Sequence, residues 1–207
     1  MLTLPAFAYW TACGFASEKR DPRSLARAAA TLVPFALLWI AYNEARWHVP
    51  WDSGHTIFFH QDADVGEVAG SPFALQNVPY QLWSFFVQGP EFSARPPYAV
   101  PTQSGVALTW TSPALLLAFA ARQPRPLVVA LWLATLLAAG PSLLYYVNGF
   151  IQFGMRHALD FEAFTFVLMA LAARRGLGWV WFTLIGISIA MGIWGSWYWN
   201  AVYRAVF

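Results

Sequence analysis

The run Leu127-Val-Val-Ala-Leu-Trp-Leu-Ala-Thr-Leu-Leu-Ala-Ala-Gly-Pro-Ser-Leu-Leu-Tyr-Tyr-Val147 decides the fold class. It contains no charged side chain, and its length falls in the range of roughly 17 to 25 residues with which an α-helix crosses the ~30 Å hydrocarbon core of a bilayer. Its apolar residues follow one another without alternation, which argues against a transmembrane barrel strand. The run therefore predicts a membrane-spanning α-helix.

The composition of the whole chain points to the same class. Its 207 residues are 58% hydrophobic, 18% aromatic and only 11% charged. A soluble domain carries about 25% charged residues, so this chain lacks the polar surface that would cover it in water. We expect an all-α, polytopic membrane helix bundle with about six transmembrane helices. The expected spans are 2–17, 25–43, 105–121, 127–147, 158–173 and 178–199.

The basic residues predict the orientation of these spans. If the spans alternate across the membrane from an outside N-terminus, eight of the twelve Lys and Arg residues fall on one side, with only two acids. These eight are Lys19, Arg20, Arg23, Arg27, Arg122, Arg125, Arg174 and Arg175. The positive-inside rule makes their side cytoplasmic. The first segment lacks the basic start and cleavage site of a signal peptide. We therefore expect the C-terminal part of a longer protein, or a shortened reading frame.

The spans divide the chain into three parts. Residues 1–43 hold two N-terminal spans, 44–104 form one large extracytoplasmic loop, and 105–207 hold the four C-terminal spans. The loop is rich in aromatic residues, which argues against disorder. Within it, Tyr80–Gln88 predicts a short helix that Gly89-Pro90 stops. Such a helix either seals the helix bundle, which is the favoured interpretation, or lies in the plane of the membrane interface.

One stretch collects polar side chains between two apolar segments. Gln152, Arg156, His157, Asp160 and Glu162 all lie within it. Ionisable groups at a membrane boundary cost free energy unless they are paired, hydrated or take part in function. The stretch is therefore a candidate functional site. An ordinary loop whose charged residues anchor helix ends explains the same pattern.

A second polar run, from Trp51 to Asp64, carries residue types that bind divalent metals. It contains two imidazoles and three carboxylates, of which hard ions prefer the carboxylates and zinc the imidazoles. These residues are Asp52, His55, His60, Asp62 and Asp64. Their spacing matches no tight metal motif. We therefore assign no cofactor, and a divalent metal stays an alternative to a solvated acidic loop.

Three motif blocks follow one another between residues 43 and 164. They are Asn43-Glu-Ala-Arg46-Trp-His-Val-Pro-Trp-Asp52-Ser-Gly-His55, Gly105-Val-Ala-Leu-Thr-Trp-Thr-Ser-Pro-Ala-Leu115, and the segment from Tyr145-Tyr146 to Phe164. In this order they resemble the C-terminal half of bacterial multi-spanning glycosyltransferases of the GT-C type. The chain departs from that pattern at His48, Val49 and Ala163, and Glu162 adds a charge.

The resemblance implies an integral glycosyltransferase of the bacterial cytoplasmic (inner) membrane, or its C-terminal fragment. It would move a sugar from a polyprenyl-phosphate donor to an acceptor on the outer face. Arg156 is the expected phosphate ligand, because a guanidinium pairs bidentately with phosphate oxygens, and Asp160 shares its helix face. The other expected donor-site residues are Gln152, His157, Arg46, Asp52 and His55. The resemblance implies that the catalytic Asp or Glu, the general base of such enzymes, lies in an earlier loop. No catalytic residue is therefore assigned in this chain.

Two other functions stay open. The chain could be a non-catalytic scaffold or partner subunit that needs another membrane chain for any chemistry. A small transporter fits less well, because it requires polar groups near mid-membrane or paired broken helices, whereas these charges gather at span ends. There is no basic face of the width that nucleic acid requires. The sequence also lacks a P-loop, a G-x-S-x-G elbow and an H-E-x-x-H motif.

Overall fold

The computed structural model describes residues 22–52, 54, 57, 59, 71–149, 152–174 and 176–203. Within these residues the protein is mostly helical. The expected first span, 2–17, lies outside the described residues. The four longer helices are α2 (Pro22–Trp47), α6 (Arg125–Leu144), α7 (Leu159–Ala173) and α8 (Trp179–Trp197), and a π-helical turn, η4 (Tyr198–Tyr203), continues α8.

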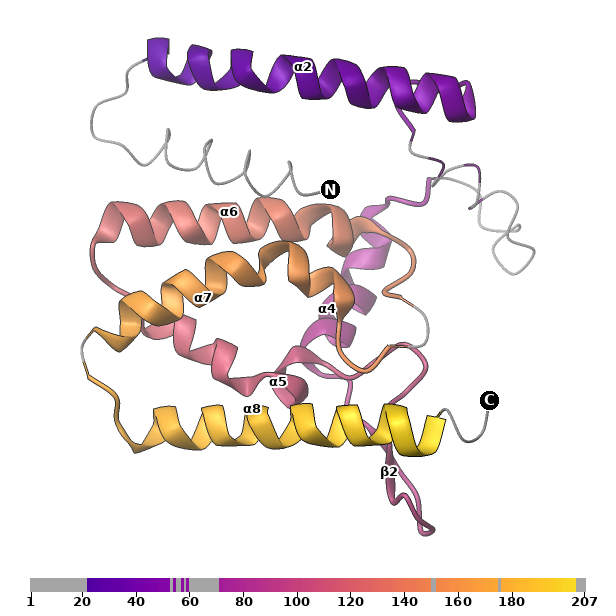
Figure 1. The fold of residues 1–207 in the computed structure, drawn as a ribbon, viewed down its shortest axis with the longest axis vertical. Coiled ribbons are helices and arrows are strands. Elements are labelled where there is room, and N and C mark those ends of the chain that lie inside the picture. Colours follow the sequence, from indigo (N-terminus) through magenta and orange to yellow (C-terminus); the bar gives the residue numbers. More distant parts are fainter. Residues whose placement is uncertain are drawn as a thin grey trace.

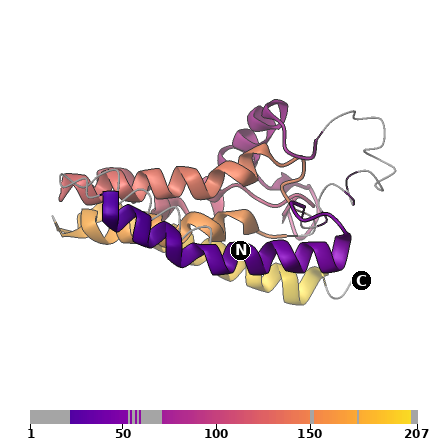
Figure 2. The same cartoon turned by 90° about the horizontal axis from the view of Figure 1, so that it is seen from above.

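These four helices lie roughly along one axis, with α2 at one edge of the row and α8 at the other (Figure 1). Helices α2, α6 and α8 run in one direction and α7 runs in the opposite one, so two opposite ends can be defined. At the arginine end lie Pro22, Arg125, Ala173 and Trp179. At the loop end lie Trp47, Leu144, Leu159 and Trp197, together with the short helix α4, which projects from the row (Figure 2).

Two described helices are long and apolar enough to cross a membrane. They are Arg125–Leu144, with 20 residues, and Trp179–Ala201, with 23 residues. At a rise of about 1.5 Å per residue, the first is about 30 Å long, which matches the hydrocarbon core of a bilayer. Two expected spans, 127–147 and 178–199, therefore contain helices of spanning length.

The expected span 105–121 is not one continuous helix. It consists of a short helix, α5 (Leu108–Thr111), and a 3₁₀ segment, η2 (Pro113–Ala120), separated at Ser112, where φ is −141° and ψ is 56°. A proline keeps the preceding residue out of the helical region, so Pro113 explains the break. The expected span at 105–121 therefore corresponds to two short helical segments joined at Ser112.

The core consists of two apolar clusters stacked along the bundle. One lies towards the loop end and joins α4, α5, α6 and α7; the other joins η2, α6 and α7. Helix α6 buries alanines between its larger side chains, among them Ala134 and Ala138. Small residues at such a seam let helices pack closely. On α7 the buried residues recur every three or four positions and are Phe161, Thr165, Leu168 and Ala172.

Helix α4 (Val78–Phe86) fulfils the expectation of a short helix in the outer loop. The 3₁₀ turn η1 (Leu75–Asn77) precedes it, and a hairpin of β1 (Glu91–Phe92) and β2 (Ala99–Val100) follows it. The buried residues of the helix are the polar Gln81 and Ser84 and the apolar Phe85, and Gln88, two residues beyond its end, is also buried. Most of its other large apolar side chains are exposed, namely Tyr80, Leu82, Trp83 and Phe86, as is Val87 after its end.

Candidate functional site

The candidate site lies at the loop end, around the segment that links α6 to α7. Tyr145 follows the last residue of α6, and its ring lies 6.4 Å from the ring of His157 and 4.9 Å from that of Tyr146. Arg156 begins the 3₁₀ turn η3 (Arg156–Ala158), and its side chain is exposed. The segment thus gathers two phenols, an imidazole and a guanidinium before α7 begins.

The electrostatic surroundings of Tyr145 show which charges lie near it. Burial, and then the neighbouring Tyr146, raise the pKa of Tyr145 to about 12, while the positive charge of Arg156 opposes that rise and the carboxylate of Asp52 adds to it. The phenol therefore stays protonated at physiological pH. Arg156, from the α6–α7 link, and Asp52, from the segment after α2, therefore both lie within electrostatic range of Tyr145.

Gln152 holds this segment in shape. Its amide nitrogen donates to the carbonyl oxygens of Ser104, at 2.7 Å, and Asn148, at 2.9 Å, and its amide oxygen accepts from the backbone N–H of Arg156 at 3.3 Å. Gly149 permits this close packing: its φ is +124°, and a Cβ there would lie 2.5 Å from the Gln152 amide. Gln152, an expected donor ligand, therefore positions the backbone of Arg156.

A buried chain of hydrogen bonds connects the same segment to α4. Asn148 Nδ2 donates to Ser84 Oγ, which donates to Gln88 Oε1 at 2.8 Å. Gln88 Nε2 in turn donates to Thr102 Oγ1 at 2.7 Å. Asn148, Ser84 and Gln88 are all buried. Because buried polar groups are stable only when they are satisfied, this network fixes the α6–α7 link against α4.

Helix α4 and the turn before it also bind backbone carbonyls at the end of α6. Asn77 Nδ2 donates to the oxygen of Leu144, and Gln81 Nε2 donates to the oxygen of Tyr145, both at 2.8 Å. The last carbonyls of a helix have no partner within the helix, so these two amides supply one. Gln81 is fully buried, and its Oε1 has no hydrogen-bond partner.

Other predicted residues are placed differently. Arg46, at the end of α2, donates to the Tyr42 hydroxyl at 2.6 Å and lies 4.7 Å from the Trp47 ring, in a cation–π contact. Its guanidinium is thus held by its own helix. Asp160 lies in the first turn of α7, where the helix dipole favours a carboxylate. Within the described residues, no ion pair joins Asp160 to Arg156. His55 lies outside the described residues.

The described part of the chain contains no group of three or more His, Cys, Asp and Glu residues arranged to hold a metal ion. Most of the sequence run with metal-binding residue types lies elsewhere, since His55, His60, Asp62 and Asp64 fall outside the described residues. Of that run the structure describes Asp52, whose side chain is partly buried.

Several residues of the site were not selected from sequence. Asn77, Gln81, Ser84 and Gln88 form the polar face of α4 and its flanks, and Tyr145 is the centre of the ring cluster. The four polar residues are spaced by four, three and four positions, which places them on one face of a helix. That periodicity inside an otherwise apolar stretch was a usable signal for a buried polar face.

A partly open apolar cavity of about 100 Å³ lies between α4, α5, η2, α6 and α7. Phe86, Leu108, Leu115, Trp132 and Phe161 form part of its wall. Two wall hydroxyls donate to backbone carbonyls, Thr109 to Phe86 at 2.7 Å and Thr135 to Leu131 at 2.9 Å. Such an apolar lining suits apolar groups of a ligand. Phe161 directly follows Asp160, so α7 links the cavity to the polar site.

The arrangement at the loop end offers an exposed guanidinium, a protonated phenol and an imidazole on a segment fixed by buried amides, with an apolar cavity close by in the fold. No known protein family, no curated protein and no solved structure matches this chain.

Proposed function

We propose that this chain is a multi-spanning membrane protein that binds a lipid-linked phosphate at its loop end. In that role it serves a GT-C-like glycosyltransferase reaction, in which a sugar moves from a polyprenyl-phosphate donor to an acceptor at the outer face. Arg156 binds the phosphate, while Tyr145 and His157 lie beside it. Part of the apolar chain of the donor occupies the partly open apolar cavity.

The surface of the helices supports a membrane location. Exposed apolar side chains run along α2, α6, α7 and α8, and include Leu38, Leu136, Phe166 and Ile193. Large contiguous apolar surfaces mark sites that meet a partner or a membrane. The exposed aromatic face of α4 extends this surface at the loop end, where Tyr80 and Trp83 stack at 6.4 Å. Tyr and Trp are the residues that concentrate at the membrane interface.

The distribution of charge supports the proposed six-span orientation. The exposed side chains of Arg23, Arg122, Arg125 and Arg174 belong to the arginine end of the bundle. Short loops rich in Lys and Arg face the cytoplasm, so the loop end would face outward. This sidedness puts Arg156 at the outer leaflet, where a lipid-linked donor can reach it.

The single observation that carries the phosphate proposal is the way Arg156 is held. Its side chain is exposed, yet its backbone is fixed by Gln152, and Tyr145 beside it is anchored by Gln81. A side chain on a fixed backbone loses less freedom on binding phosphate than one on a mobile loop.

The test is a binding measurement in nanodiscs with a short polyprenyl phosphate and the matching uncharged polyprenol. We expect Arg156→Ala to weaken binding of the phosphate by about tenfold or more, the loss of roughly one charged hydrogen bond, and to leave polyprenol binding unchanged. Arg174→Ala, an exposed arginine at the opposite end, is the matched control and should change neither. Equal affinity of wild type and Arg156→Ala for the phosphate would contradict the proposal.

A second measurement addresses the transfer reaction itself. Membranes that contain the protein are supplied with a radioactive sugar linked to polyprenyl phosphate. The radioactivity transferred to acceptor molecules is then counted. Transfer that is lost in Arg156→Ala supports the enzyme. Phosphate binding without transfer would instead identify the chain as a partner subunit that depends on another membrane chain.

A further inference from the structure

Helix α8 is covered by the rest of the described bundle at very few positions. Only 6% of its spanning window is buried, against 39% for α6. Among the residues that the structure describes, Gly195 is the one buried residue of the helix. Towards the middle of α8, Ser188 Oγ accepts a hydrogen bond from the backbone N–H of Ala114 at 3.1 Å. The side chain that covers Gly195 therefore makes a second attachment, near the loop end.

That side chain is Phe153, from the link between α6 and α7. Its ring lies so close to α8 that a Cβ at Gly195 would be 2.5 Å from Phe153 Cε1. The same ring meets the Trp194 ring edge-on, with 5.2 Å between the centroids. Glycine destabilises a helix interior relative to alanine, but at this position a side chain would collide with the ring. Gly195 thus makes room on α8 for Phe153.

The backbone on either side of Phe153 belongs to the candidate site. Gln152 directly precedes it and accepts a hydrogen bond from the backbone N–H of Arg156. The carbonyl oxygen of Phe153 accepts another from the N–H of Val106 at 2.8 Å. Phe153 therefore joins α8, the loop before α5 and the segment that carries Arg156. A displaced ring would shift the adjacent amide of Gln152, on which the Arg156 backbone depends.

We propose that Phe153 and Gly195 are positioning residues of the loop-end site. The ring, packed on Gly195, holds residues 152–156 in the conformation in which Gln152 binds the Arg156 amide. The effect on phosphate binding rests on the proposed function; the effect on the backbone does not. If the packed ring favours phosphate binding, bound phosphate favours the packed ring by the same factor. A contact that only attaches α8 to the bundle would show no such coupling.

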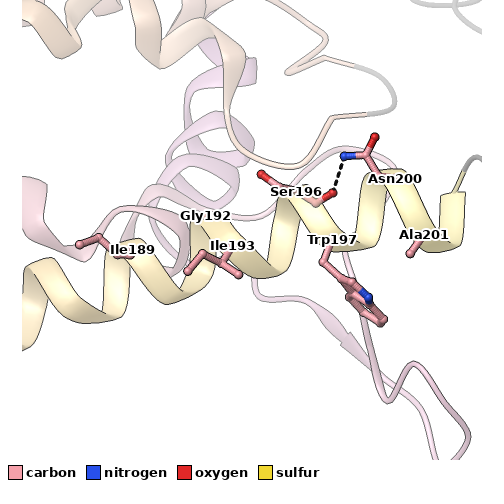
Figure 3. Close-up of a pocket in the computed structure, with 7 residues that line it drawn as sticks. All are labelled: Ile189, Gly192, Ile193, Ser196, Trp197, Asn200 and Ala201. Atoms are coloured by element: carbon pink, nitrogen blue, oxygen red, sulfur yellow. Dashed lines mark hydrogen bonds between the residues drawn. The ribbon is translucent and has the colours of Figure 1, made fainter.

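Gly195→Ala tests the contact by placing a methyl group where the ring lies. A hollow of about 390 Å³, lined by Gln152, Phe153 and Trp199 among others, adjoins the contact, so the ring can move without disrupting the core. Gly192→Ala is the matched control. It makes the same change about one turn earlier on α8, at the open surface shown in Figure 3, where a Cβ would have nothing within 4 Å.

The first measurement is hydrogen–deuterium exchange of the segment 152–158, on the whole protein in nanodiscs. We expect exchange of the Arg156 amide to rise by about tenfold in Gly195→Ala and in Phe153→Ala, and to stay unchanged in Gly192→Ala. The double variant Gly195→Ala/Phe153→Ala should exchange no faster than Phe153→Ala, because the ring that the methyl group displaces is gone. Wild-type rates in Phe153→Ala, or additive effects in the double variant, would overturn the proposal.

The second measurement is the affinity for a short polyprenyl phosphate and for the matching polyprenol. Gly195→Ala and Phe153→Ala should each weaken phosphate binding by about tenfold and leave polyprenol binding unchanged. Phosphate should also slow exchange of the Arg156 amide less in Phe153→Ala than in wild type. Equal phosphate affinity of wild type and Phe153→Ala would overturn the coupling.

Failure of the proposed function gives a different result. In that case Arg156→Ala binds the phosphate as tightly as wild type, and the exchange rates alone decide whether Phe153 holds the segment. Phe153→Ala creates no collision, so it decides both measurements even if Gly195→Ala does not fold.

Discussion

Arg156 donates its backbone amide to the side-chain oxygen of Gln152 at 3.3 Å, while the nitrogen of the same glutamine binds the carbonyls of Ser104 and Asn148. One amide thus joins the loop before α5 to the loop before α7. The backbone position of Arg156 therefore depends on Gln152, a residue that need not touch the ligand.

Gln152→Ala should therefore weaken binding of polyprenyl phosphate without removing a charge. The variant loses three hydrogen bonds, and the carbonyls that Gln152 satisfied lose their partner, which costs about 1–3 kcal/mol of stability for each buried group left unpaired. The checks are the thermal unfolding midpoint and the affinity for the phosphate. Gln103→Ala, an exposed glutamine near the same loop, is the control. If Gln152→Ala bound polyprenyl phosphate as tightly as the wild type, the proposed role of Gln152 in positioning Arg156 would be contradicted.

Gln81→Ala tests the attachment of α4 to α6. It leaves the carbonyl of Tyr145 without the donor that binds it at 2.8 Å, and we expect a loss of about 1–3 kcal/mol in unfolding free energy. Gln123→Ala, at an exposed position at the arginine end, should be neutral. Denaturant titration in detergent measures both. An equal effect of the two substitutions would show that Gln81 is not a structural anchor.

Two glycines should respond to alanine in opposite directions. At Gly149, with φ at +124° and no room for a Cβ beside Gln152, alanine should destabilise the protein by more than about 1 kcal/mol. Gly186 lies on the exposed side of α8 with open space around it, so alanine there should stabilise the helix by up to about 1 kcal/mol. Thermal melts of the two variants give the comparison. Stabilisation by Gly149→Ala would contradict the loop geometry.

Sidedness can be measured with single cysteines in a Cys13→Ser background. We expect a membrane-impermeant maleimide to label Gln103→Cys from outside intact cells, and to label Gln123→Cys only after the membrane is opened. The reason is the separation of the loop end from the arginine end. Labelling of both positions from the same side would reject the six-span orientation and the outward-facing phosphate site.

Helices of spanning length could be predicted from sequence because a long apolar run can be recognised without knowledge of any tertiary contact. This holds for α6 and α8. The break at Ser112 was also readable, since a proline acts on its immediate neighbour, but the overall apolarity of 105–121 masked it. In both cases the deciding information is local.

The site was harder to predict because its contacts join distant parts of the chain. Arg156 and Asp52 were selected as chemically suitable residues, and both lie within electrostatic range of Tyr145. The residue types did not reveal that the Gln152 side-chain amide donates to the carbonyl oxygen of Ser104, 48 positions away. It also did not reveal that Arg46 binds its own helix through Tyr42.

The exposed aromatic face of α4 has a practical consequence for handling the protein. A detergent that forms only a belt around the long helices would leave Trp83, Phe86 and Val87 in contact with water at the loop end. The micelle must also cover the exposed face of α4, which projects from the row of long helices. Detergents with small micelles should therefore cause aggregation through this face even while the long helices stay solubilised. Lipid discs that supply an interface should keep the protein dispersed.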